Sequence, residues 1–122
     1  MAGFREMFVY QKSFDLAVRI FRLTKAFPKE ELFGLTSQVR NSSRSTCANF
    51  GEAYRRRRYK AHLVAKLTDS DAENTETQVH LDMAVPCEYA TQEQVAPLIA
   101  LSEEVGLMLN HLIENPEKLL LK

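Results

Sequence analysis

The sequence of 122 residues has no tryptophan, only two cysteines, four glycines and four prolines. Cys47 and Cys87 stand far apart, so they form neither a C-x-x-C metal pair nor the framework of a disulfide-rich protein. No apolar run approaches the roughly 18 residues that a membrane-spanning helix needs. The first residues, MAGFREMFVYQK, carry charge from Arg5 onward and lack the apolar centre of a secretion signal. These absences predict a single soluble, cytoplasmic domain over residues 1–122, with no membrane partner.

Basic residues are almost missing from the second half of the chain. Residues 1–66 hold fourteen lysines and arginines against five acidic residues, whereas residues 67–122 hold two against eleven. The two halves therefore carry formal charges of +9 and −9, although the whole chain is neutral. A neutral chain lacks the high isoelectric point of a typical nucleic-acid binder, but a polarised one has strong local fields. Charge alone thus leaves both a nucleic acid and another protein open as partners.

Strand-like alternation is also absent, and apolar residues recur at helical spacing along nearly the whole sequence. We expect four helices and a short tail, over residues 8–27, 35–57, 59–84, 92–114 and 115–122. Pro28 and Pro86 end the first and third ranges, and Thr91 with Gln94 has the spacing of a capping box that opens the fourth. Pro97, about two turns into the fourth range, predicts either a later start or a kink. Four amphipathic helices with short connections predict an all-α fold, an up-down antiparallel four-helix bundle.

The segment AYRRRRYKAH, residues 53–62, places four consecutive arginines between two tyrosines. At 100° per residue, Arg40, Arg44, Arg55 and Arg58 fall along one side of the second helix, away from its apolar seam. Cys47 and Gly51 lie within this stripe and are small, so a phosphate backbone could approach closely. The predicted nucleic-acid-binding residues are Arg40, Arg44, Arg55, Arg56, Arg57, Arg58, Lys60, Tyr54 and Tyr59. The cations would neutralise phosphates and the two tyrosines would stack on bases. The alternative is a solvated charged face whose tyrosines are half-buried caps of the bundle.

Opposite charge on the two halves also predicts self-assembly. The positive first hairpin of one copy would meet the negative second hairpin of the next in a heterologous contact, which closes into a ring or continues as a filament. Complementary fields steer such a contact, and outward apolar residues supply its affinity. Those residues are expected on the first helix, at Phe14, Val18 and Phe21, and on the fourth, at Ile99, Met108 and Ile113. The alternative is a monomer whose own two hairpins pair with each other.

No catalytic or metal-binding constellation is predicted. Asp69, Glu73, Glu76 and His80 share one face of the third helix, but di-metal carboxylate bundles need a Glu-x-x-His motif, which the sequence lacks. Cys47 has no neighbouring base in the sequence that would activate it. We therefore expect no enzyme activity, no metal and no cofactor.

Amide side chains at the edge of the expected core are predicted to set how the helices meet. Asn49 is the main candidate, and Gln38 and Gln78 are expected to act in the same way. Their role would be structural, because each amide would hydrogen-bond a neighbouring helix rather than a ligand.

Several motifs occur in the order and at the spacing of a known family. They are Tyr10-Gln11-Lys12, the Phe27-Pro28 stop, GLTSQVR from Gly34 to Arg40, and AENTETQVHLDMA around Glu76 to Gln78. Together with ANFGEAYRRRRYK, they resemble the four-helix bundle proteins of the 23S rRNA intervening-sequence family over roughly residues 4 to 113. Ala53 and Arg55 stand where that family typically has glycine, and the turn from Val85 to Tyr89 also has none. These departures concern loop geometry rather than the fold.

The resemblance implies a bundle that forms rings, with a homopentamer as the expected form, and no known enzyme activity. A related group, the accessory proteins of diversity-generating retroelements, resembles a basic pentameric barrel that binds reverse transcriptase and nucleic acid. The implied function is a non-catalytic, oligomeric protein that associates with RNA or a nucleoprotein through its basic face. The alternative is a protein-binding scaffold or ring whose basic and acidic faces pair between subunits, with no nucleic-acid role.

Overall fold

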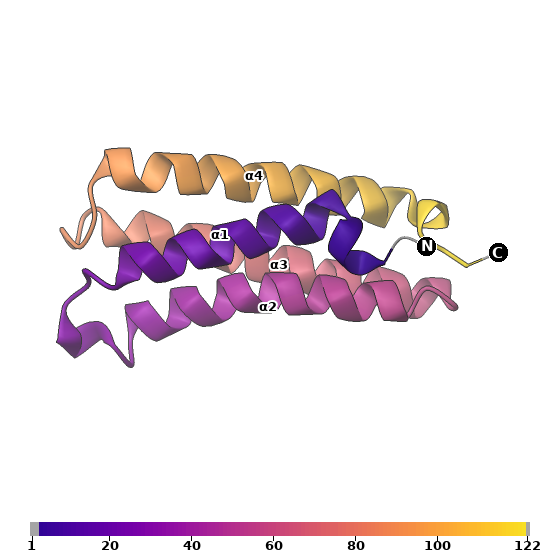
Figure 1. The fold of residues 1–122 in the computed structure, drawn as a ribbon, viewed down its shortest axis with the longest axis horizontal. Coiled ribbons are helices and arrows are strands. Elements are labelled where there is room, and N and C mark those ends of the chain that lie inside the picture. Colours follow the sequence, from indigo (N-terminus) through magenta and orange to yellow (C-terminus); the bar gives the residue numbers. More distant parts are fainter. Residues whose placement is uncertain (1–2, 122) are drawn as a thin grey trace.

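The computed structural model describes residues 3–121, which form four long helices and no strand (Figure 1). The long helices are α1 (Phe8–Thr24), α2 (Leu35–Arg55), α3 (Lys60–Ala84) and α4 (Gln92–Glu114). Three short 3-10 helices, η1 (Phe4–Glu6), η2 (Lys29–Glu31) and η3 (Pro116–Lys118), lie between or beside them. Each long helix packs against two others, α1 and α3 both contacting α2 and α4. Successive helices run in opposite directions, which confirms the predicted all-α, up-down antiparallel bundle.

Three helix ends differ from the predicted ranges, and the smallest difference is at α3, which begins at Lys60 rather than 59. α1 ends at Thr24 rather than 27, because the chain tightens into a turn in which Ala26 and Phe27 donate to carbonyls only three residues back. α2 ends at Arg55 rather than 57, and its last carbonyls are satisfied by Arg56 N and by the Arg57 side chain.

Helix α4 begins at Gln92, where the predicted capping box is present. Thr91 Oγ1 accepts from Gln94 N, and the Gln94 side chain accepts from Thr91 N. Pro97 therefore lies inside the helix and does not mark a later start. Because proline has no N–H, the carbonyl of Glu93 receives no helical hydrogen bond from position 97.

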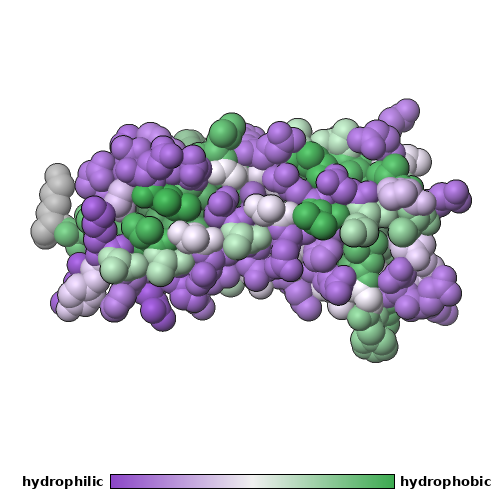
Figure 2. Space-filling model, turned by 180° about the vertical axis from the view of Figure 1, so that it is seen from behind, coloured by the Kyte–Doolittle hydropathy of each residue, from purple (hydrophilic) through white to green (hydrophobic). Residues whose placement is uncertain are grey.

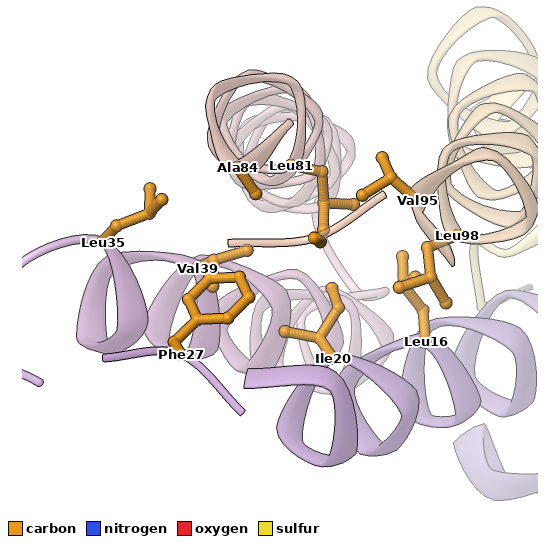
Figure 3. Packing of buried hydrophobic residues seen from close by; sticks show 10 residues of the cluster. Leu16, Ile20, Phe27, Leu35, Val39, Leu81, Ala84, Val95 and Leu98 are labelled. Carbon is orange, nitrogen blue, oxygen red and sulfur yellow. The ribbon is translucent and has the colours of Figure 1, made fainter. Parts of the chain in front are cut away.

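Two apolar clusters fill the bundle, one toward each end. Figure 3 shows the first, at the end formed by the α1–α2 and α3–α4 loops, where side chains from all four helices point toward one another. Its buried members are Leu16, Ile20, Phe27, Leu35, Val39, Leu81, Ala84, Ala90, Val95 and Leu98. The second cluster lies toward the chain termini and contains Val9, Phe50, Ala53, Leu63, Leu67, Val105, Leu109, Leu112 and Leu119.

A buried polar belt separates the two clusters. Asn74 Nδ2 donates to the carbonyl of Ser102 at 2.9 Å, and Ser102 Oγ donates to Asn74 Oδ1 at 2.9 Å, which joins α3 to α4. On the other side, α3 is joined to α2 through Ser42, Thr46, Ser70 and Thr77. Within residues 3–121, every buried side-chain nitrogen and oxygen has a hydrogen-bond partner. The belt therefore fixes the helix register without leaving an unsatisfied group.

Asn74, not Asn49, is the deeply buried amide. Asn49 is only partly buried and donates to the carbonyl of Ser45 in its own helix, while its Oδ1 accepts from Lys66 Nζ at 3.3 Å. Gln78 does link helices as predicted, because its Nε2 donates to Ser102 Oγ at 3.0 Å. Gln38 is exposed, so it lies outside the contacts between helices.

A hydrogen bond joins the two loops at the end of the bundle far from the termini. The Tyr89 hydroxyl donates to Glu31 Oε2 at 2.7 Å, and Glu31 Oε1 accepts from Leu35 N at the start of α2. These hydrogen bonds lower the pKa of Glu31, and the bond to Glu31 raises the pKa of Tyr89 to about 12. Nearby, Glu88 has a φ of 63°, which is the left-handed conformation that glycine adopts most easily. Glu88 lies in the turn from Val85 to Tyr89, which contains no glycine.

Titration of Tyr89 tests this loop contact. Because the neutral phenol is the form that donates to Glu31, the contact stabilises the fold fully below pH 10 and is lost as pH rises through about 12. We expect the ultraviolet difference between the wild type and a Tyr89→Phe variant to show one phenol ionising near pH 12. A difference signal centred at the ordinary tyrosine value of 10.0 would show that the contact is not formed in solution.

Candidate functional site

An apolar groove runs between α1 and α2 on the outside of the bundle and encloses about 770 Å³. Its walls are Phe14, Val18 and Phe21 of α1, and the small residues Cys47, Ala48 and Gly51 of α2. Arg44, Arg55 and Arg56 also line it and supply positive charge beside the apolar surface. Large side chains remain accessible here, since Phe14 is 52% exposed. This α1–α2 groove confirms the prediction that the small residues of α2 leave a hollow edged by arginines. The wall formed by α1, with its two phenylalanines, was not part of that prediction.

Three cations surround the ring of Phe21 at one end of the groove. The Arg40 guanidinium lies 4.7 Å from the ring centroid, Lys25 Nζ 4.9 Å and the Arg44 guanidinium 5.9 Å. Arg40 is further held by a 2.8 Å hydrogen bond from its Nε to Thr24 Oγ1. Arg40 is thus half-buried and joins α1 to α2, whereas Arg44 remains exposed.

A second group of cations lies where α2 turns into α3. Arg55, Arg56, Arg58, Tyr59 and Lys60 are all exposed, and we call this group the basic corner. The ion pairs within residues 3–121 use Lys12, Arg19 and Lys66 as cations, so none involves the basic corner. Tyr59 is 61% exposed and meets only the edge of His62, at 5.5 Å between ring centroids.

Tyr54 and Arg57 form a structural pair instead of an open binding surface. Tyr54 is 8% exposed, its ring face is covered by the Arg57 guanidinium at 3.7 Å, and Phe4 approaches it edge-on. Arg57 Nε also donates to the carbonyl of Tyr54, and Leu121 N donates to the carbonyl of Arg57. The stacking role predicted for Tyr54 does not fit this arrangement, because no base can reach the covered ring.

The nine residues predicted to bind nucleic acid therefore have three different surroundings, although Arg44, Arg55 and Arg56 all line the groove. Arg40 and Arg44 flank Phe21, Tyr54 and Arg57 pair with each other, and the remaining five form the basic corner. These residues are separated because α2 ends at Arg55. Arg58 would lie on the same side of the helix as Arg40 only if α2 continued to residue 58.

Helix α3 has a second stripe of small and apolar residues on its outer face, which the sequence analysis missed. Seven exposed positions repeat at spacings of three and four: Ala61, Ala65, Thr68, Ala72, Thr75, Val79 and Met83. Figure 2 shows this outer stripe as a row of white, pale green and green residues along the middle of the face opposite α1. The hydroxyls of Thr68 and Thr75 donate to carbonyls four residues back, so the methyl group is the unbonded, apolar part of each exposed side chain.

Carboxylates flank the outer stripe on both sides. On a helical wheel, Asp69 and Glu76 fall on one side of it, and Asp71 and Asp82 on the other. Glu73 lies beside Asp69 and Glu76, and its pKa is raised, first by partial burial and then by these two carboxylates. The predicted acidic face of α3 thus lies beside an exposed apolar one.

The outward apolar face predicted for α4 is not present. Ile99 packs against the first core cluster, and Met108 and Ile113 pack against the second. On α1 the prediction is confirmed, because Phe14, Val18 and Phe21 line the groove.

Cys47 is the cysteine that lines the groove. Burial raises the pKa of the Cys47 thiol, which lowers the fraction of reactive thiolate. Among residues 3–121, no group of three His, Cys, Asp or Glu residues is arranged to hold a metal ion. None of the helices in this range is long and apolar enough to cross a bilayer.

Comparisons with known proteins agree with the resemblance seen in the motifs. Residues 5–111 match the family described as 23S rRNA-intervening sequence protein. A crystal structure of a protein with unknown function, from the S23 ribosomal protein family of Bacteroides thetaiotaomicron, superimposes with a TM-score of 0.76 at 29% identity. The alignment covers 86% of this chain and 97% of that one. A search of curated proteins gave no significant match.

Proposed function

Because the chain belongs to the family of 23S rRNA-intervening sequence proteins, we propose that it is a non-catalytic binding protein that associates with RNA through its basic corner. The solved relative is itself described as having unknown function, so the proposal depends on the residues of this chain. Phosphate neutralisation is assigned to Arg55, Arg56, Arg58 and Lys60, and base stacking to Tyr59.

The observation that carries the proposal is the state of the four cations at the α2–α3 turn. They are exposed, and none of them forms a salt bridge within residues 3–121, although sixteen acidic residues balance the charge of the chain. Arg56 has one acidic neighbour, Glu52, whose pKa is lowered first by Lys66 and then also by Arg56. Surface charges further apart than about 10 Å are largely screened at ordinary salt, so the acidic half does not cancel this local field. A chain reversal displays the cations together with one exposed aromatic ring, which suits an unpaired nucleotide strand.

Salt-dependent binding tests the proposal. We expect labelled structured RNA to bind in a fluorescence-anisotropy titration, with log affinity falling linearly as log salt rises, by about 0.7 to 0.9 per phosphate neutralised. A variant with Arg58→Ser and Lys60→Ser should lose about two such contacts, so its slope should be shallower by roughly 1.4 to 1.8. Single-stranded DNA measured in parallel shows whether the 2′-hydroxyl contributes.

The matched control removes the same charge elsewhere. Arg22 and Lys29 are exposed cations outside both the corner and the groove, so an Arg22→Ser, Lys29→Ser variant should keep the wild-type slope. Equal losses in both variants would point to non-specific attraction, and no binding at about 50 mM salt would exclude the RNA role.

Self-assembly is the second candidate function, and the α1–α2 groove favours it. A large apolar surface left open on a single chain marks an interaction site. We propose that copies of the chain associate, with a closed ring of five as the form that the family resemblance implies. Light scattering during size-exclusion chromatography measures this directly, against a mass of 14.0 kDa for one chain.

A further inference from the structure

We propose that the outer stripe of α3 in one copy docks into the α1–α2 groove of the next copy. This inference depends on the self-assembly just proposed and names the two surfaces that would form the contact. It does not depend on RNA binding.

The two surfaces are complementary in size. The groove presents large side chains, Phe14, Val18 and Phe21, on one wall. The outer stripe presents alanines and threonine methyl groups over most of its length. Small residues on one helix let another helix approach to about 8 Å between axes, and the large side chains of the partner then fill the space. The repeat of three and four residues is the spacing by which one helix face packs along another.

The two surfaces are also complementary in charge. Arg44, Arg55 and Arg56 line the groove together with one carboxylate, Glu52, which Lys66 Nζ pairs at 2.7 Å. Carboxylates border the stripe, and no lysine or arginine occurs between Lys66 and Lys118. At 1.5 Å per residue, Arg44 and Arg55 are about 16 Å apart along α2. Asp69 and Asp82 are about 20 Å apart along α3, so the two charge patterns have similar lengths. Docking would place each set of charges beside its opposite.

The same charges disfavour the symmetric alternatives. If two α3 stripes paired, the flanking carboxylates of both copies would come together. If two grooves paired, the arginines of both copies would come together. Like charges brought together across an interface are costly, so each surface is better matched to the other than to itself. The contact is therefore heterologous, and repetition builds a ring when the rotation between copies closes.

Two single substitutions block the two surfaces separately. Ala72→Arg puts a bulky cation in the middle of the stripe, and Ala48→Glu puts a carboxylate in the groove. Both alanines are exposed on helices, and both new residues are good helix formers, so the fold should be retained. Ala100→Arg, at an exposed alanine of α4 outside the stripe, is the control for adding a cation.

Light scattering during size-exclusion chromatography gives the readout, with circular dichroism confirming that each variant is folded. We expect the wild type and Ala100→Arg to form the same assembly, and each blocked variant alone to have the mass of a single chain. An equimolar mixture of Ala72→Arg and Ala48→Glu should form a species of two chains and no larger, because one intact stripe and one intact groove remain.

Three outcomes would overturn the inference. They are a monomeric wild type, an assembly that survives Ala72→Arg, or two blocked variants that stay monomeric when mixed. Arg55 and Arg56 belong to both the basic corner and the groove, but the docking variants leave both arginines unchanged. The RNA-binding variant changes Arg58 and Lys60, which do not line the groove. Failure of RNA binding and failure of docking are therefore separate results.

Discussion

Replacing Phe50 by alanine is expected to lower the free energy of unfolding by about 4 kcal/mol. Phe50 is 0% exposed and is the largest fully buried side chain in the second core cluster. Removing its ring loses the free energy of burying it and leaves a cavity among Val9, Leu63 and other members of that cluster, which rigid helices cannot fill. The melting temperature should fall by roughly 15 °C for a chain of this length.

Urea denaturation measures this loss, and two other phenylalanines serve as controls. Phe33→Ala, at a side chain that is 92% exposed, should change the free energy of unfolding by less than about 0.5 kcal/mol. Phe14→Ala should also leave stability nearly unchanged while weakening assembly, because Phe14 lines the groove. A small effect at Phe50 would mean that the second cluster is loosely packed.

Asn74→Asp is expected to cost about 3 kcal/mol, although it changes only one atom. The substitution replaces the Nδ2 donor by an oxygen that faces the carbonyl of Ser102, and it places a negative charge at a position that is 1% exposed. No lysine or arginine is hydrogen-bonded there to balance the charge, since the partners of Asn74 come from Ser102.

The loss should depend on pH, which separates it from a simple packing defect. Burial raises the pKa of the new carboxyl group, so the penalty is small at low pH and grows as pH rises through neutrality. Asn110→Asp makes the same change at an exposed position of α4 and should shift stability by less than about 0.5 kcal/mol. Equal effects at positions 74 and 110 would contradict the buried belt.

Local signals predicted the fold because they act within a few residues. Pro28 and Pro86 interrupt helices by removing a donor, and the Thr91–Gln94 capping box opens α4 wherever the rest of the chain lies. The 3.6-residue period of apolar positions identified four helices, and short connections left antiparallel packing as the simple arrangement. The outward apolar residues of the first helix, Phe14, Val18 and Phe21, were also foreseen, but not that they form one wall of the groove.

Features that depend on contacts between distant residues were missed. Tyr54 and Arg57 were taken for open surface because a wheel carries no information on the guanidinium that covers the ring. Asn74 was overlooked because its partner, Ser102, lies on another helix. The outer stripe of α3 was missed because that helix has small or apolar residues on two opposite faces. Its sequence therefore lacks the single apolar face that identifies an amphipathic helix. Searching each predicted helix for a second set of positions at spacings of three and four would have found it.

The placement of the chain ends decides how the protein should be labelled. Both termini lie at the end of the bundle that carries the α2–α3 turn (Figure 1), and Leu121 hydrogen-bonds to Arg57 there. A purification tag or fluorophore on either end would therefore sit beside the basic corner and would interfere with a test of the RNA binding that we propose there. Cys87 is exposed in the loop at the opposite end, whereas Cys47 is buried. A maleimide dye would thus react selectively at Cys87 and report on the proposed RNA binding from the opposite end of the bundle.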